Sequence, residues 1–402
     1  MTDDPQRHIE QQVDALLLDF GRYEPLELLQ REGRLLYADY EAWRGGELET
    51  LDEALMGETS AIRRLLDHAS AYAARLGLSG QRESYSGWGA EQGGALRIHS
   101  DRQLEQAIAL VWRPAEDRPQ MDLFMDSPAT TLANGVRDAL LNRDPVTARQ
   151  RLEQLYDVEA GYLELPGLER LVEALEQADK AVEDIDQALD ALQSGIAPLA
   201  ADLLKRRVQD YLAPLWRRLA AALDGVPFDP QSPDRHASHA LAQLQDWRGV
   251  REVIEQTPGW RRQPLLLARH SQACTRLNDE PASQQSVLLL CWRFPEQAAG
   301  LLADYPSALM RQAWADFEAL PDELESELFP AWLLIRYPAL AKSLPMEIDG
   351  CEARGVQAYR LVHQLQQQRG QALDDEQIDL RKALQAESPA LLARYMRDAA
   401  IV

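Results

Sequence analysis

Apolar side chains return every three to four residues along most of the chain, which is the spacing of amphipathic helices. Residues 6–19 and 59–77 have this spacing, and each run reaches a glycine that is suited to end a helix. From residue 128 onward the same spacing recurs in pairs of runs that are joined by short polar turns. The pattern predicts an all-α protein, arranged as an irregular α-solenoid of stacked helix pairs.

The pattern changes between residues 79 and 126, which are rich in Gly, Ser and Pro. Two short runs there, residues 85–88 and 96–99, flank a glycine-bearing loop and predict a β-hairpin. A loop with three prolines, residues 224–234, marks a second boundary. We therefore expect four segments: an N-terminal helical unit (1–78), a small mixed α/β or loop insert (79–126), a helix pair followed by a long charged helical hairpin (127–225), and a helical-repeat region (226–402).

The most regular apolar pattern lies between Leu168 and Leu192. Eight apolar residues follow one another there in alternating steps of three and four, as in a heptad repeat. This spacing gives a narrow seam, and it predicts one long helix that pairs with a second helix, at about residues 198–224, in an antiparallel hairpin. Pro214 lies inside the second helix and is expected to kink or split it.

The charges of the two predicted hairpin helices are complementary. Residues 152–192 hold 12 acidic and 2 basic side chains, and residues 205–276 hold 12 basic and 7 acidic ones. Exposed ion pairs add only about 0–1 kcal/mol each, so such pairs would set orientation and partner choice. They would act within one molecule, or between two copies that associate through residues 168–223. Charge runs that simply face water are the alternative.

Three of the helix pairs turn at similar residue clusters: Asn-Arg-Asp-Pro at 142–145, Gln-Asp-Trp at 245–247, and Asn-Asp-Glu-Pro at 278–281. The aspartate of the third cluster follows that of the second by 33 residues, and the second follows the first by 102, three times 34. Each turn stops one helix and supplies an acidic residue or a proline at the start of the next.

This spacing resembles that of tetratricopeptide repeats, whose unit is a helix pair of about 34 residues. In that family a small residue opens the second helix and a large one follows four positions later. Ala148 and Leu152 match these positions in one pair, and Val250 and Ile254 match them in another. The resemblance covers about 100 residues and implies a concave face of stacked helices that binds a protein or a peptide.

The order Arg-aromatic-Pro occurs twice, at residues 293–295 and 336–338, each time at the end of an apolar run. The residue before a proline is pushed out of helical conformation, and the proline then fits the first turn of the next helix. We interpret both sites as corners, where the aromatic ring is a wedge between helices and Arg293 or Arg336 covers its open side. A groove of arginine and aromatic groups for a peptide ligand is the alternative.

The chain has 402 residues, of which 46% are hydrophobic and 27% are charged, as in ordinary folded proteins. Its formal net charge of −23 disfavours general binding to nucleic acid or to anionic lipid. No apolar run approaches the roughly 18–20 residues of a membrane span, and the first residues are acidic where a secretory signal would be basic and then apolar. We expect a cytoplasmic protein without membrane association or cofactor, whose three cysteines are reduced and buried.

Candidate chemistry is sparse. His236 and His239 have the spacing of two metal ligands on one helix face, and Asp234 before them is suited to cap the helix. Ser86 and His99 are nucleophile and base types in one loop-rich segment that also holds Asp101, but no nucleophile-elbow motif surrounds the serine. A metal-dependent or hydrolytic enzyme that uses either group is therefore one alternative function, and an acidic mimic of nucleic acid is a second.

The pattern favours a non-catalytic interaction or scaffold protein with a protein or peptide partner. Its candidate interaction surface combines side chains of the basic region with those of the two corners, and consists of Arg206, Arg207, Arg217, Arg218, Arg261, Arg262, Trp292, Arg293 and Arg336.

Overall fold

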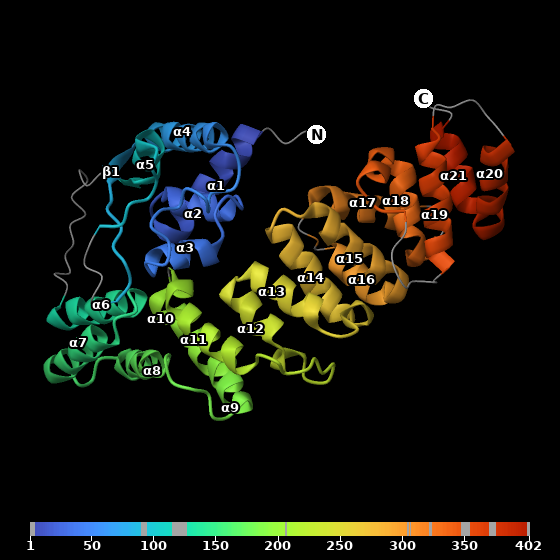
Figure 1. Ribbon diagram of the computed structural model, residues 1–402. Coiled ribbons are helices and arrows are strands. Elements are labelled where there is room, and N and C mark those ends of the chain that lie inside the picture. Colours follow the sequence, from blue (N-terminus) through green and yellow to red (C-terminus); the bar gives the residue numbers. More distant parts are fainter. Residues whose placement is uncertain are drawn as a thin grey trace. The chain divides into compact units, whose positions relative to one another are not determined.

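A computed structural model describes residues 5–89, 95–114, 127–205, 207–303, 305, 307–320, 324–346, 354–369 and 375–399 (Figure 1). The described chain is mostly helical, which confirms the expected all-α class, and it divides into two compact units. Unit 1 comprises Met1–Val226 and Asp234–Asp246, and unit 2 comprises Pro227–Pro233 and Trp247–Val402. Among the described helices, none is both long enough and apolar enough to cross a lipid bilayer.

Unit 1 begins with short helices and a two-stranded sheet and continues with helix pairs. Its elements are α1 (Pro5–Phe20), α2 (Pro25–Arg31), α3 (Tyr37–Arg44), α4 (Thr59–Arg75), β1 (Leu78–Arg82), α5 (Arg102–Ile108), β2 (Leu110–Pro114), α6 (Pro128–Leu141), α7 (Pro145–Val158), α8 (Leu165–Glu176), α9 (Ile185–Asp190), the π-helical segment η1 (Ala191–Ile196), α10 (Ala197–Leu204), α11 (Val208–Ala222) and α12 (Ala237–Leu244).

The sheet lies at the edges of the expected insert. β1 and β2 pair antiparallel, and Tyr23 adds a bridge to Trp112 on the other side of β2. The hairpin predicted inside the insert was wrong as a pair of full strands. The described residues of its two runs meet in one antiparallel bridge, between Ser86 and Ala95, and in one hydrogen bond from the Leu96 N–H to the Tyr85 carbonyl at 2.7 Å. β2 has consecutive Leu, Val and Trp and buries Val111 completely, so it gains more from pairing than a short run interrupted by glycine.

The single long helix predicted for residues 168–192 was also wrong. α8 ends at Glu176, and turns follow as far as Asp184, whose side chain caps α9. Acidic residues four positions apart, such as Asp179 and Glu183, would repel each other in a helix. Aspartate also competes with the helix backbone for hydrogen bonds, so the apolar stripe alone did not decide the secondary structure.

The second predicted hairpin helix is split at Lys205 and Arg207, and not at Pro214. Lys205 and Arg207 have positive φ angles of 52° and 58°, which end α10 and begin α11. α11 runs without interruption past Pro214. Because α8 contacts both α10 and α11, the two predicted regions do pack together, but as shorter helices.

The three turns predicted from the residue clusters have the same backbone geometry. The residue before each aspartate is left-handed, with φ of 55° at Arg143, 61° at Gln245 and 58° at Asn278. In each turn the aspartate N–H donates to the carbonyl five residues earlier, at 2.9–3.0 Å, as in a Schellman motif. Asp144 and Asp279 also cap the following helices with their side chains, which confirms the predicted turns.

Unit 2 consists of helices that pack against their neighbours in the sequence, for example α14 against α15 and α18 against α19 (Figure 1, yellow to red). Its elements are α13 (Trp247–Gln256), η3 (Trp260–Arg262), α14 (Pro264–Arg276), α15 (Glu280–Arg293), α16 (Pro295–Ala303), α17 (Ala308–Glu318), η4 (Ser326–Leu328), α18 (Phe329–Arg336), η5 (Pro338–Lys342), α19 (Arg354–Gln367), α20 (Asp375–Glu387) and α21 (Pro389–Ala399). A 3-10 turn, η2 (Pro233–Arg235), lies where the chain passes between the units.

Both Arg-aromatic-Pro sites are helix ends, as predicted. Phe294 and Tyr337 leave helical conformation with φ of −141° and −127°, and the prolines after them begin α16 and η5. Arg336 lies over the Tyr337 ring at 5.6 Å. The rings at these corners are only half-buried, and a fully packed aromatic cluster of the same unit consists of Trp314, Phe317, Phe329 and Trp332.

Candidate functional site

The arginines that we considered as an interaction surface in unit 1 bind groups of their own unit. Arg207 pairs with Asp210 at 3.0 Å, and Arg217 pairs with Glu41. Arg206 lies outside the described residues. These arginines therefore act first as internal partners of carboxylates.

The corresponding residues of unit 2 also have internal contacts. Arg261 lies over the Trp260 ring at 4.9 Å, and Arg293 donates to the Arg261 carbonyl at 2.6 Å. Trp292 is buried at 3% exposure, so it belongs to the core. The remaining two candidates, Arg262 and Arg336, are exposed.

His236 and His239 have different partners. The buried His236 ring bonds to Ser238 at 2.8 Å and caps α12, the role that we expected for Asp234. Asp234 instead bonds to His239 at 3.2 Å, because α12 begins only at residue 237, and the His239 ring contacts Trp216. In the part of the chain that the structure describes, no three His, Cys, Asp or Glu side chains are placed to hold a metal ion.

Ser86 and His99 do not form the catalytic pair that their residue types suggested. The Ser86 carbonyl accepts from Arg44 at 2.9 Å, whereas the His99 ring accepts from the backbone N–H of Asp101 and lies 3.5 Å from Asp52. No hydrogen bond joins Ser86 to His99 in the described structure. Asp101 caps α5 with its carboxylate, so it is not available to orient the histidine.

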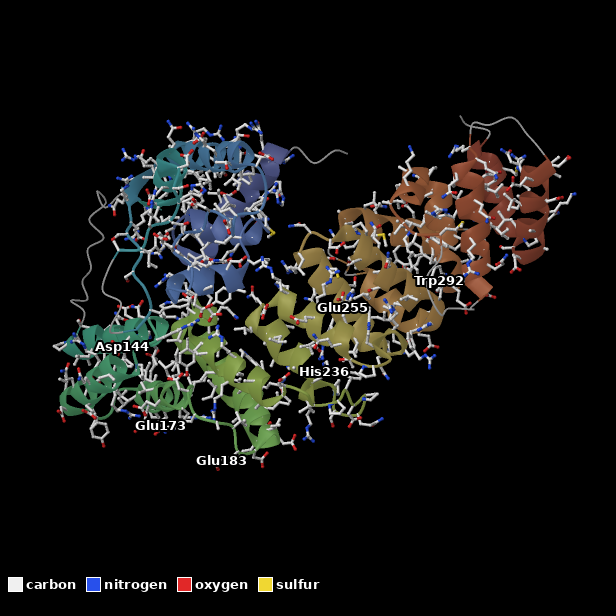
Figure 2. The ribbon with its side chains drawn as sticks, in the orientation of Figure 1. Asp144, Glu173, Glu183, His236, Glu255 and Trp292 are labelled. Carbon is white, nitrogen blue, oxygen red and sulfur yellow. The ribbon has the colours of Figure 1, made fainter. Side chains whose placement is uncertain are left out.

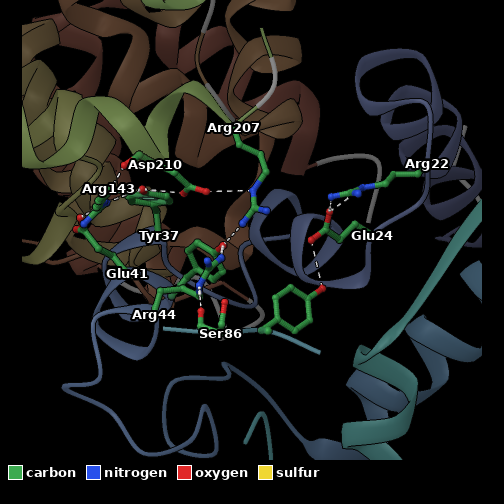
Figure 3. Close-up of polar contacts among 11 residues, drawn as sticks. Arg22, Glu24, Tyr37, Glu41, Arg44, Ser86, Arg143, Arg207 and Asp210 are labelled. Carbon is green, nitrogen blue, oxygen red and sulfur yellow. Dashed lines mark hydrogen bonds and ion pairs between the residues drawn. The ribbon is translucent and has the colours of Figure 1, made fainter. Parts of the chain in front are cut away.

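Sequence analysis missed a buried group of charged and phenolic side chains in unit 1 (Figure 3). They come from the start of α2, from α3, from the turn between α6 and α7, and from the start of α11. We call this group the ionic cluster, and its members are Glu24, Tyr37, Tyr40, Glu41, Arg44, Arg143, Arg207 and Asp210.

Asp210 lies at the centre of the ionic cluster and is 4% exposed. Its carboxylate accepts from the Tyr37 hydroxyl at 3.1 Å and pairs with Arg207, which also donates to the Tyr40 hydroxyl. Burial raises the pKa of Asp210 above its ordinary value, and the neighbouring arginines only partly oppose this shift. A carboxylate in this position is therefore costly unless all of its partners are present.

The Arg143 side chain supplies a hydrogen bond that the backbone of α11 lacks. Pro214 has no N–H to give to the carbonyl of Asp210, four residues earlier in the helix. The Arg143 Nε donates to that carbonyl at 2.7 Å, and its Nη2 donates to Glu41 at 2.6 Å. The Trp88 ring lies 3.6 Å from the guanidinium and covers it. The turn between α6 and α7 is thus attached to both α3 and α11.

A further carboxyl group, Glu27, borders the ionic cluster and a cavity of about 400 Å³. Burial and the nearby carboxylate of Glu24 raise the pKa of Glu27 to about 7. Arg22 and Arg217 also pair with two carboxylates of the ionic cluster, Glu24 and Glu41, and the positive charges of Arg207 and Arg31 partly oppose the rise in the pKa of Glu27. Removal of the carboxyl group from water is the largest cause of the rise, so Glu27 holds its proton to an unusually high pH.

A groove of about 580 Å³ lies between α8, the α9–η1 segment and α11, and we call it the α8–α11 groove. Two residues of the predicted apolar stripe, Val182 and Leu192, line it, on either side of the start of α9. η1 contributes a wide π-helical turn, a feature that often accompanies functional sites. The apolar side chains that line the groove are Ala174, Val182, Ala188, Ala191, Leu192, Ile196, Leu215 and Leu219.

The surroundings of the α8–α11 groove are acidic. Two cations of its lining are engaged, since Arg149 forms two hydrogen bonds to Glu176 and Arg218 donates to backbone carbonyls at 2.6 and 3.1 Å. A third cation, Arg170, is exposed. Glu173 and Glu183 lie beside α8 and α9 (Figure 2). The exposed carboxylates of this region are Glu169, Glu173, Asp179, Glu183, Asp184, Asp186 and Asp190.

Comparison with known proteins gives no match for this chain, either to a protein-family model, to a curated protein or to a solved structure.

Proposed function

We propose that the protein is an interaction protein that binds a basic, amphipathic helix of a partner protein in the α8–α11 groove. The observation that carries this proposal is an apolar groove beside a stretch of exposed carboxylates, residues 169–190, which we call the acidic rim. The lining of the groove itself also holds three arginines, Arg149, Arg170 and Arg218. A helix with apolar residues at every third or fourth position would fill the floor, and its Lys or Arg residues would face the rim. The acidic rim would speed association with a basic partner and repel nucleic acid or another acidic protein.

We also interpret the helix pairs as tetratricopeptide-like repeats of an irregular solenoid, which serves as the scaffold of the groove. The equal geometry of the three turns supports this interpretation. The four positions of the resemblance are also buried, with Ala148, Val250 and Ile254 at 0% exposure and Leu152 at 5%. In the first pair α6 packs closely against α7, as two helices of a repeat require, whereas α13, which holds Val250 and Ile254, packs against α14.

The test is titration of the full chain with a fluorescent helical peptide of about 15 residues that has leucines on one face and lysines on the other. We expect saturable binding that weakens several-fold when NaCl is raised from about 50 to 300 mM. The variant Ala188→Arg places a long cation in the groove at a half-buried position, and it should weaken binding at least about tenfold.

The matched control is Ala201→Arg, the same substitution at an exposed position of α10 that does not line the groove. It should change the affinity less than about twofold. Equal binding by both variants, or by a peptide in which glutamates replace the lysines, would refute the proposal. If light scattering instead shows a dimer that Ala188→Arg dissociates, the occupant is a second copy of this chain.

A further inference from the structure

Unit 2 contains a cavity of about 490 Å³ among α13, η3, α14 and α15, far along the sequence from the residues of the groove. Three of its lining residues come from three successive helices: Glu255 from α13, His270 from α14 and Ser286 from α15. The helices pack in sequence order, α13 on α14 and α14 on α15, so one side chain of each reaches the same space.

These three side chains form a continuous chain of hydrogen bonds. The Ser286 Oγ lies 2.8 Å from His270 Nδ1, and His270 Nε2 lies 3.1 Å from Glu255 Oε1. An ionised carboxylate only accepts hydrogen bonds, so His270 carries its proton on Nε2. Its Nδ1 is then an acceptor, and the Ser286 hydroxyl donates to it. A nucleophile, a base and an orienting carboxylate are thus connected in that order.

The charge states agree with this arrangement. Burial lowers the pKa of His270, against the opposing effect of Glu255, so the ring is neutral at neutral pH. Although burial opposes it, hydrogen bonds from Arg251 and His270 keep the pKa of Glu255 below its ordinary value. The groups that face the ring are Glu255 and Arg251 from α13, Arg261 from η3, Cys274 from α14 and Ser286 from α15.

The walls of the cavity supply one flat surface and one accessible cation. The Trp260 ring is stacked on His270 with ring centroids 4.5 Å apart, which fixes the plane of the imidazole. Arg251 is bound by Glu255 and Asp279, at 2.8 Å each. Arg261 is exposed and lies against Trp260, so its guanidinium remains available to a negative charge that forms in the cavity.

We propose that this cavity hydrolyses small carboxylic esters, with Ser286 as the nucleophile and His270 as the general base. The Ser286 Oγ bonds to the ester carbonyl carbon while its proton moves to His270 Nδ1. The alkoxide leaves with that proton, and the resulting acyl-serine is hydrolysed by a water that His270 deprotonates in the same way. Glu255 is a positioning residue that keeps the ring in the required tautomer.

The oxyanion of this reaction would be stabilised by a side chain. Ser286 lies within α15, where its backbone N–H belongs to the helix, so the usual backbone donors next to the nucleophile are missing. Arg261 is the cation that can take their place. The modest stabilisation by one guanidinium predicts slow turnover, and a covalent probe is therefore a more sensitive test than the rate alone.

The test treats the full chain with a fluorophosphonate probe and locates the adduct by mass spectrometry, alongside hydrolysis of p-nitrophenyl acetate. We expect the adduct on Ser286. Ser286→Ala should remove the adduct and lower hydrolysis at least about tenfold. Glu255→Gln should lower the rate and move the acidic limb of the pH profile to lower pH, because Glu255 supports the proton affinity of His270.

The matched control is Ser283→Ala. Ser283 is a second buried serine of α15, but it bonds to Ser271 and Tyr305 and does not line the cavity. Its variant should keep the adduct on Ser286 and hydrolyse within about twofold of the wild type, with melting temperatures recorded for both serine variants. Absence of an adduct on Ser286 in the wild type would overturn the proposal, as would equal loss in both variants. Ala188→Arg should leave hydrolysis unchanged, so failure of the groove proposal is distinguishable.

Discussion

The ionic cluster of unit 1 and the Ser286–His270–Glu255 chain of unit 2 are both polar groups inside helical packing, but they face different surroundings. Glu24, Glu41, Arg44 and Asp210 are each at most 6% exposed, and each of them binds an arginine or a phenolic hydroxyl. In unit 2 the Glu255 side chain is 44% exposed, and the chain of hydrogen bonds borders a cavity. Both groups border a cavity, because Tyr37, Tyr40, Arg207 and Asp210 line the one beside Glu27. Ser286 and His270 are themselves only 2% and 4% exposed, so what differs is the carboxylate, which is buried in unit 1 and partly exposed in unit 2.

The difference follows from the cost of desolvation. Charges that are removed from water need several close partners, and once these are in place no coordination remains for a substrate. The ionic cluster thus joins α3, α11 and the turn between α6 and α7, and its side chains that line the cavity beside Glu27 are already bonded to one another. A neutral serine and a neutral histidine need fewer partners, so they can border a cavity and keep one face for a ligand.

The largest effect that we predict tests whether the ionic cluster is structural. Asp210→Ala removes the partner of Arg207 and Tyr37 and leaves a buried guanidinium without its carboxylate. We expect a loss of about 3–5 kcal/mol in the free energy of unfolding, measured by urea denaturation of the full chain. Asp157→Ala, an exposed site on α7, is the control and should change stability by less than about 0.5 kcal/mol. Equal stability of the two variants would contradict a structural role.

Much of unit 2 and its turns was predictable from local sequence. The left-handed residue and the aspartate of each turn interact with neighbouring backbone groups. Residues such as Asn278 and Asp279 therefore determine the conformation of the turn locally. The same is true of the corners at Phe294 and Tyr337, because proline restricts the residue before it. The conformations of these turns and corners depend on interactions between residues at most five positions apart. They can therefore be predicted without the packing of the helices.

The ionic cluster and the cavity were not predictable, because their members are far apart in the chain. Tyr37 and Asp210 are separated by 173 positions, and Glu255 and His270 belong to helices whose rotation about their axes is set by packing. One signal was available for the cluster. A proline inside an otherwise regular helix leaves a carbonyl that needs a donor, so Pro214 indicated that a side chain such as that of Arg143 would reach Asp210.

A second, smaller effect concerns the carboxyl group of Glu27, which lies beside the ionic cluster. The pKa of Glu27 is raised from an ordinary 4.5 to about 7, so the folded state keeps a proton that the unfolded state has lost. Its contribution to stability is therefore complete below pH 4.5 and is lost as the pH rises to 7 and above. Gln resembles the protonated form, and Glu27→Gln should be about 2 kcal/mol more stable than the wild type at pH 8 and equally stable near pH 4.

Urea denaturation of the full chain at both pH values measures this difference. Glu153→Gln, at an exposed position on α7, is the control and should have the stability of the wild type within about 0.5 kcal/mol at either pH. If Glu27→Gln gave no gain at pH 8, ionised Glu27 would not destabilise the folded state, and the raised pKa would be contradicted.

The smallest predicted loss of stability comes from a comparison of two arginines that bind the same carboxylate. One of the two is mostly buried and the other is exposed. Glu41 pairs with Arg143, whose side chain is 14% exposed, and with Arg217, whose side chain is 50% exposed. Arg217→Ala should cost less than about 1 kcal/mol, because water replaces the guanidinium and salt screens the pair. Arg143→Ala should cost more, since it also leaves the Asp210 carbonyl without a donor. Unfolding in about 50 and 500 mM NaCl distinguishes the two, because only the small loss at Arg217 should shrink with salt.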